Sequence, residues 1–147
     1  VHDDVWSKVR PKSSASPHLF IKAIELLEFE ATEARFFNRL SNRAAKELRT
    51  AFFAEAQDIS DWTVQRAISE KIGVNFDEVH KKIETGEAIA KLAADYELGQ
   101  SLHVQGSPTY ILSEGRLILF GNISYGILEA NVSELLSERT GESGSVC

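Results

Sequence analysis

The chain has 147 residues, of which 43% are hydrophobic and 26% are charged, so it is long enough for one compact domain of ordinary globular composition. Its net charge of −6 argues against a nucleic-acid-binding protein, whose domain would be basic. It has no apolar run of about 18 residues, which a membrane-spanning helix needs, and its first residues do not show the pattern of a signal peptide.

The sulfur-containing residues limit the chemistry that the chain can perform. There is no methionine, even at position 1, which indicates that Val1 is not a native start. The single cysteine is the last residue, Cys147, so no disulfide framework can form within the chain. We therefore expect a reducing, cytoplasmic location, and we interpret Cys147 as a solvent-exposed thiol.

The first sixteen residues show no sustained hydrophobic period and predict an ordered loop. Ser16-Pro17 then resembles a helix start, with an N-cap followed by proline at the first helical position. The helix after it should bury residues that recur at helical spacing, which are Phe20, Ala23, Ile24 and Leu27.

A second helix is predicted over residues 34–56, where an apolar residue recurs every four positions. These residues are Phe36, Leu40, Ala44, Leu48 and Phe52. The phenylalanines of this segment could line an apolar pocket, but their spacing favours a core position for Phe36, Phe37, Phe52 and Phe53. A basic stripe on the same helix is typical of a solvated face and consists of Arg35, Arg39, Arg43, Lys46 and Arg49.

A third helix is predicted to begin after Asp58 or Ser60, either of which can cap it, and to end at Gly73. Its inner face is predicted to consist of Val64, Ala67, Ile68 and Ile72.

A fourth helix should follow Asn75, which forms a variant of the capping box with Glu78. Its apolar residues are Phe76, Val79 and Ile83. Gly86 should break this helix, and a fifth helix continues to about Leu102.

The hydrophobic period changes after residue 102. Thr109–Leu112 and Leu117–Phe120 are short apolar runs rich in strand formers, and the four residues between them contain a glycine, so a β-hairpin is predicted. A last helix is expected over residues 124–138, with an inner face of Leu128, Val132, Leu135 and Leu136. Two strands alone form a marginal sheet with open edges, so the hairpin needs partners.

Pro108 comes immediately before the first predicted strand, a position where a residue that cannot donate to the ladder is tolerated. The order helix, V-x-G-S-P-T, hairpin and closing helix resembles the second half of a thioredoxin fold, and the helices before it resemble the insertion in DsbA-type proteins. Segments 11–23, 51–60 and 106–136 are similar to a DsbA-like, FrnE-type subfamily of thiol–disulfide oxidoreductases.

The resemblance implies an α/β, thioredoxin-like fold with a helical insertion domain, in a chain that is mostly helical with one C-terminal hairpin. Residues 1–102 would form the insertion domain with its entry loop, residues 103–138 the C-terminal half of the thioredoxin-like domain, and residues 139–147 a flexible tail.

The same resemblance implies a substrate-binding loop. In the family, the proline that matches Pro108 is cis and lies against the redox cysteines, and the backbone of the residue before it can pair with an extended substrate. The implied substrate-binding residues are Gly106, Ser107, Pro108 and Thr109.

Three further residues are candidates for substrate binding: His103 and His18 flank the segments that should border the active cleft, and Ser16, for which an N-cap role is favoured, could contact a thiol ligand. Either histidine could tune a neighbouring thiol, but capping or surface roles are more common for such residues. No metal is expected, because the spacing of the four histidines fits no metal site.

The chain departs from the family in its catalytic residues. It has no C-x-x-C motif, and thiol–disulfide exchange needs a thiolate of low pKa. No catalytic residue is therefore assigned, and we expect the chain to be the C-terminal part of a longer protein, without its first β-α-β unit and inactive alone.

Two other functions stay open. A kappa-type glutathione transferase or 2-hydroxychromene-2-carboxylate isomerase would share the insertion and the proline loop and would bind glutathione; otherwise no cofactor is expected. A redox-inactive module would keep the cleft to bind extended peptides. The expected partners are thiol or disulfide substrates, either proteins or small thiols, with no nucleic acid and no membrane, and a homodimer is a further option.

Overall fold

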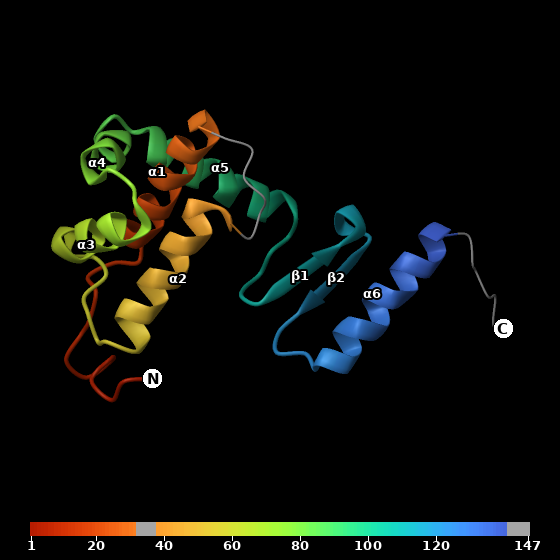
Figure 1. The fold of residues 1–147 in the computed structure, drawn as a ribbon. Helices are drawn as coiled ribbons and strands as arrows, with labels where there is room; N and C mark the ends of the chain where they lie inside the picture. Colours follow the sequence, from red (N-terminus) through yellow and green to blue (C-terminus); the bar gives the residue numbers. More distant parts are fainter. Residues whose placement is uncertain (32–37, 141–147) are drawn as a thin grey trace. The chain divides into compact units, whose positions relative to one another are not determined.

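The computed structural model describes residues 1–31 and 38–140 and consists mostly of helices (Figure 1). The elements follow in the order α1 (Ala15–Ala31), α2 (Leu40–Phe53), α3 (Trp62–Ile72), α4 (Phe76–Glu84), α5 (Glu87–Ser101), β1 (Thr109–Leu112), η2 (Ser113–Gly115), β2 (Leu117–Phe120) and α6 (Tyr125–Thr140). The predicted architecture of successive helices followed by a single hairpin is confirmed for these residues.

The chain divides into two compact units, Val1–Tyr96 and Glu97–Cys147, and the division falls within α5. The boundary expected after residue 102, between the insertion domain and the thioredoxin-like part, concerns the family's domains and stays a prediction. No helix among the described residues is long and apolar enough to cross a membrane.

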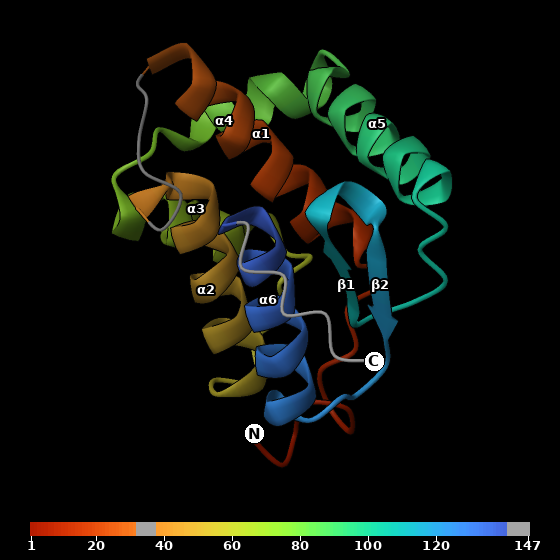
Figure 2. The same cartoon turned by 90° about the vertical axis from the view of Figure 1, so that its right-hand side faces the viewer.

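The core of the first unit lies where α1 packs against α2 and α4 (Figure 2). The predicted inner face of α1 is confirmed, because Phe20, Ala23 and Ile24 are completely buried and Leu27 is half-buried against them. Helix α2 adds residues of its four-residue repeat, and the core cluster consists of Phe20, Ala23, Ile24, Ala44, Leu48, Ala51, Ile68, Ile72, Phe76, Val79 and Ala88.

The segment before α1 is ordered by contacts with the end of α2. Val5 is buried, the Trp6 ring meets Phe52 edge-on at a centroid distance of 4.9 Å, and the His2 N–H donates to the Phe53 carbonyl at 2.6 Å. The predicted ordered loop is therefore confirmed.

Helix α2 corrects part of the second predicted helix. It begins at Leu40, and Arg35, Phe36 and Phe37 lie outside the described residues. Phe52 is buried as expected, but Phe53 is 40% exposed, because its ring lies edge-on against Phe52 at the helix end. The solvated face is confirmed at three of its basic residues, which are Arg43, Lys46 and Arg49.

The starts of two helices differ from the prediction. Helix α1 begins at Ala15, whose N–H donates to Ser13 Oγ at 3.0 Å, so Ser16 lies within the first turn and is not the N-cap. Asp61 caps α3 by accepting from the Thr63 N–H at 2.7 Å. Asp58 accepts hydrogen bonds from Ser60 instead, in the loop before the helix.

The inner face of α3 is also rotated from its predicted position. Ala67 is exposed, Val64 is half-buried, and two polar residues, Gln65 and Ser69, are buried beside Ile68 and Ile72. The rotation has a clear cause in the hydrogen bonds that the Gln65 amide donates to Ser16 Oγ at 2.8 Å and to the Ile59 carbonyl at 2.9 Å.

The ends of α3 and α4 agree with the sequence. Gly73 has a φ of 80° at the C-cap of α3, and Gly86 has a φ of 82° after α4, which are left-handed conformations that favour glycine. Asn75 caps α4 by accepting from the Asp77 N–H at 2.9 Å.

The second unit contains the antiparallel hairpin and α6, which lie side by side in both views (Figures 1 and 2). The strand bounds agree with the prediction, and the register pairs Thr109 with Phe120 and Leu112 with Leu117. Gly115 in the connecting turn has a φ of 93°, as its role in the turn requires.

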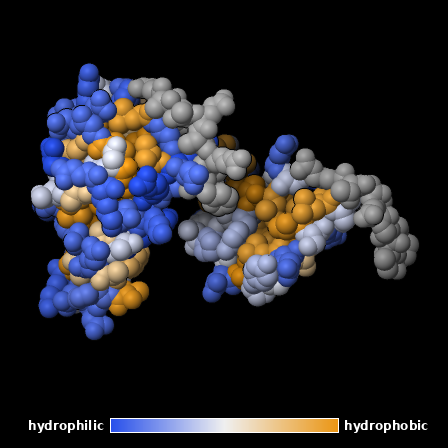
Figure 3. Space-filling model, in the orientation of Figure 1, coloured by the Kyte–Doolittle hydropathy of each residue, from blue (hydrophilic) through white to orange (hydrophobic). Residues whose placement is uncertain are grey.

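No residue from Glu97 to Ser137 is buried. The predicted inner face of α6 is therefore wrong for Val132 and Leu136, which are 39% and 57% exposed, while Leu128 and Leu135 are half-buried. A two-stranded sheet is too small to cover a whole helix face, and Figure 3 shows apolar surface over the hairpin and α6. The tail after Thr140, including Cys147, lies outside the described residues.

Candidate functional site

The candidate site is the loop between α5 and β1, and His103 lies in the turn that follows the last helical residue, Ser101. The His103 backbone is left-handed, with a φ of 56°, and its N–H donates to the Gln100 carbonyl at 3.0 Å. The Val104 N–H donates to the Gly99 carbonyl at 2.9 Å, which completes a helix-terminating motif in which glycine is the usual residue. The turn directs the chain away from the helix axis and into the loop.

The second half of the loop contains the expected substrate-binding residues. The Ser107–Pro108 peptide bond is cis, and the Pro108 carbonyl accepts from the Gly121 N–H at 3.0 Å. The Thr109 hydroxyl donates to the Gly106 carbonyl. Ser107 and Pro108 are exposed, so the loop is held by β2 and its own threonine while its tip faces solvent.

The hydrogen-bond pattern of the hairpin defines which backbone groups stay open. Pro108 and Gly121 form a hydrogen-bonded pair, so the alternation of an antiparallel ladder places Tyr110 and Leu112 in the next such pairs. The N–H and C=O groups of Thr109 and Ile111 therefore point to the outer edge of β1. Within the described part of the chain, Ser107 also makes no hydrogen bond. An extended chain can pair with such an edge.

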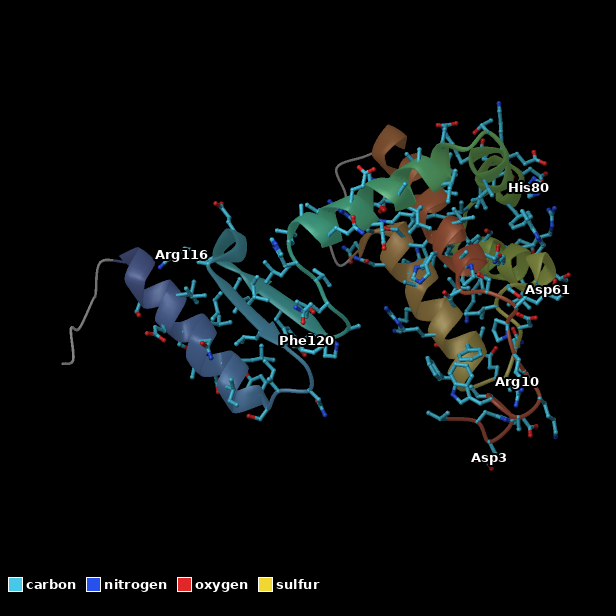
Figure 4. The ribbon with its side chains drawn as sticks, turned by 180° about the vertical axis from the view of Figure 1, so that it is seen from behind. Asp3, Arg10, Asp61, His80, Arg116 and Phe120 are labelled. Atoms are coloured by element: carbon cyan, nitrogen blue, oxygen red, sulfur yellow. The ribbon has the colours of Figure 1, made fainter. Side chains whose placement is uncertain are left out.

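Phe120 closes one side of the loop. A Cβ at Gly106 would lie 3.1 Å from Phe120 Cε2 and 3.3 Å from Cζ, so the ring lies directly on the glycine backbone. Figure 4 labels this side chain on the hairpin. An open hollow of about 270 Å³ adjoins the ring and is lined by His103, Gln105, Thr109, Ile118 and Phe120.

The other two candidates belong to the first unit. Ser16 Oγ donates to the Ser60 carbonyl at 3.3 Å and accepts from the Gln65 amide, so it connects α1 to the start of α3. His18 is exposed on α1. The structure thus brings His103 and residues 106–109 together in one loop, and the roles predicted for Ser16 and His18 stay predictions.

Phe120 and Gly121 support the loop, although no motif in the sequence marks them as site residues. The register of the hairpin could have identified them, because it places Phe120 opposite Thr109 and Gly121 opposite Pro108. Among the described residues, no group of three or more His, Cys, Asp or Glu side chains is arranged to hold a metal ion.

Comparison with known proteins adds an independent finding. A family model described as a DSBA-like thioredoxin domain matches residues 30–133, which include the whole loop and hairpin. No curated protein matches the chain. The family match agrees with the thioredoxin-like fold class and with the broad resemblance found in the sequence.

Proposed function

Because the chain belongs to the DSBA-like thioredoxin domain family, we propose that it forms the substrate-binding part of a thiol–disulfide oxidoreductase of the FrnE type. Its substrates are proteins or small molecules that carry a thiol or a disulfide. The observation that carries the proposal is the exposed loop of Ser107 and Pro108, which continues into the open edge of an apolar strand.

The chemistry of exchange divides the work between this loop and a dithiol. A thiolate attacks one sulfur of a disulfide, a mixed disulfide forms, and the other sulfur leaves as a thiolate; a second thiol then attacks the mixed disulfide and releases the first partner. The loop contains no sulfur, and the one cysteine of the chain is Cys147. We propose that the attacking pair lies in a segment outside these 147 residues and that the loop holds the substrate beside it.

The open hairpin supports this division. Both strands are apolar at almost every position, which is typical of strands that are covered on both faces. A preceding β-α-β unit would supply neighbouring strands and covering helices together with the dithiol. The reaction needs no metal or organic cofactor, and a cytoplasmic location is consistent with the single cysteine.

An insulin-reduction assay tests the proposal. The 147-residue chain should show no dithiol turnover, whereas a protein that also carries the residues encoded before Val1 should reduce insulin and lose activity when its cysteines are replaced. Glutathione conjugation by the longer protein, dependent on a serine, would establish the kappa-type alternative. A longer protein with neither a cysteine pair nor such a serine, but with affinity for peptides, would establish the redox-inactive alternative.

A further inference from the structure

The loop of Ser107 and Pro108 is supported by a side chain that takes no part in the exchange reaction. The Phe120 ring comes from the far end of β2 and lies on the backbone of Gly106, the residue before Ser107. The ring is 57% exposed, so it is not a core residue. Its close contact on the loop side is with a glycine whose φ lies outside the left-handed region. Position 106 therefore requires glycine because the Phe120 ring leaves no room for a side chain, and not because of the backbone conformation.

Three contacts converge on the short segment 106–109. The Phe120 ring covers Gly106, the Thr109 hydroxyl holds the Gly106 carbonyl, and the Gly121 N–H holds the Pro108 carbonyl. Ser107 lies between these fixed points and is exposed and without a hydrogen bond in the described residues. The direction of its N–H and C=O groups therefore depends on the positions of Gly106 and Pro108.

We propose that Phe120 is a positioning residue for substrate binding: by pressing on Gly106 it fixes the Ser107 backbone in the orientation that an extended peptide can pair with. The effect on substrate binding rests on the proposed function, whereas the contact between the Phe120 ring and Gly106 does not. The clamp consists of Phe120, Gly106 and Thr109.

The contact makes a specific prediction about pairs of substitutions. Gly106→Ala introduces a methyl group into the Phe120 ring and should displace the loop. Phe120→Ala removes the ring and should loosen the loop, but it also makes room for the methyl group. The double variant should therefore resemble Phe120→Ala alone, so that the two effects are strongly non-additive, as expected for residues in direct contact.

The first measurement uses the ¹⁵N-labelled 147-residue chain and needs no substrate. The Ser107 amide signal should shift and its hydrogen exchange should change in Phe120→Ala and in Gly106→Ala, while Phe120→Tyr, which keeps the ring, should leave both near wild type. Ile127→Ala, an exposed apolar side chain on α6 that does not line the hollow beside Phe120, is the matched control. An unchanged Ser107 signal in Phe120→Ala would overturn the clamp.

The second measurement is the affinity of the same variants for a short synthetic peptide of alternating valine and serine. Phe120→Ala should weaken binding by up to about tenfold, the factor that corresponds to one misdirected backbone hydrogen bond. Phe120→Tyr should restore the affinity. Altered Ser107 signals without any peptide binding to the wild type would contradict the proposed function and leave the clamp standing; peptide binding that Phe120→Ala does not weaken would contradict the positioning role.

Discussion

At the scale of single residues, Glu28 shows how a side chain from one helix caps another. The residue is 8% exposed, and its carboxylate accepts from the Leu40 N–H at 2.6 Å and from Ser41 Oγ at 2.9 Å. The residue at the N-cap of α2, Arg39, makes no side-chain capping bond. The first N–H groups of a helix need acceptors and form its positive end, so a carboxylate from α1 is a suitable substitute for a local cap.

Glu28→Gln should lower the free energy of unfolding by about 1–3 kcal/mol, because an amide offers one acceptor where the carboxylate offers two and leaves a buried group unsatisfied. Urea unfolding followed by circular dichroism measures the change. Glu70→Gln, an exposed site on α3, is the control and should shift stability by less than about 0.5 kcal/mol. Equal effects at both sites would show that Glu28 does not cap α2.

At the scale of elements, α5 is attached to α1 mainly by charges. Ala88 is its buried residue, whereas Lys22 on α1 pairs with Asp95 on α5 and with Glu25, which also lies 3.5 Å from Lys91. Burial, the largest single effect, lowers the pKa of Lys22, but the hydrogen bonds to Asp95 and Glu25 and the negative charges of these two carboxylates together outweigh it and raise this pKa above its ordinary value. The protonated lysine is therefore the form that stabilises the fold.

Lys22→Met should destabilise the chain at neutral pH, and the difference from wild type should shrink at alkaline pH. A raised pKa in the folded state means that the stabilisation is complete below the ordinary lysine value of 10.5 and is lost as the pH rises through the folded value. Urea unfolding of both proteins at pH about 9 and about 11.5 measures this difference. Lys46→Met, at an exposed position, should show no such dependence. A difference that stays constant up to the higher pH would contradict the role of the ion pairs.

The elements also show what a sequence can predict. Strand bounds and helix ends followed from local chemistry, as at Thr109–Leu112 and Gly73, because apolar runs and left-handed glycines depend on few neighbours. The starts of α1 and α3 did not, since several serines and aspartates compete for each cap. The Glu28 cap joins residues 12 positions apart, and the Phe120 contact with Gly106 depends on the hairpin register. Such contacts exist only after the chain has folded.

At the scale of the whole molecule, the two units differ in how much of their apolar surface is buried. The first unit has a closed core, whereas no residue of Glu97–Ser137 is buried. Ile118 and Phe120 are 44% and 57% exposed on one face of the hairpin, and no further strand in residues 1–31 and 38–140 pairs with either edge of it. Exposed apolar strands with unpaired edges associate readily with other chains. The sequence predicted this need for partners, because two strands are too few for a stable sheet.

The 147-residue chain should therefore self-associate through its second unit, and a charge on the hairpin should reduce the association. Sedimentation velocity over a range of concentrations measures it, with Ile118→Lys as the test and Ile89→Lys, which is 52% exposed on α5 in the first unit, as the control. Ile118→Lys should shift the chain towards monomer because the burial of a lysine charge opposes sheet pairing, whereas Ile89→Lys should not. A wild-type chain that stays monomeric at all concentrations would mean that the hairpin is stable with its faces in water. Equal effects of both lysines would place the contact outside the hairpin.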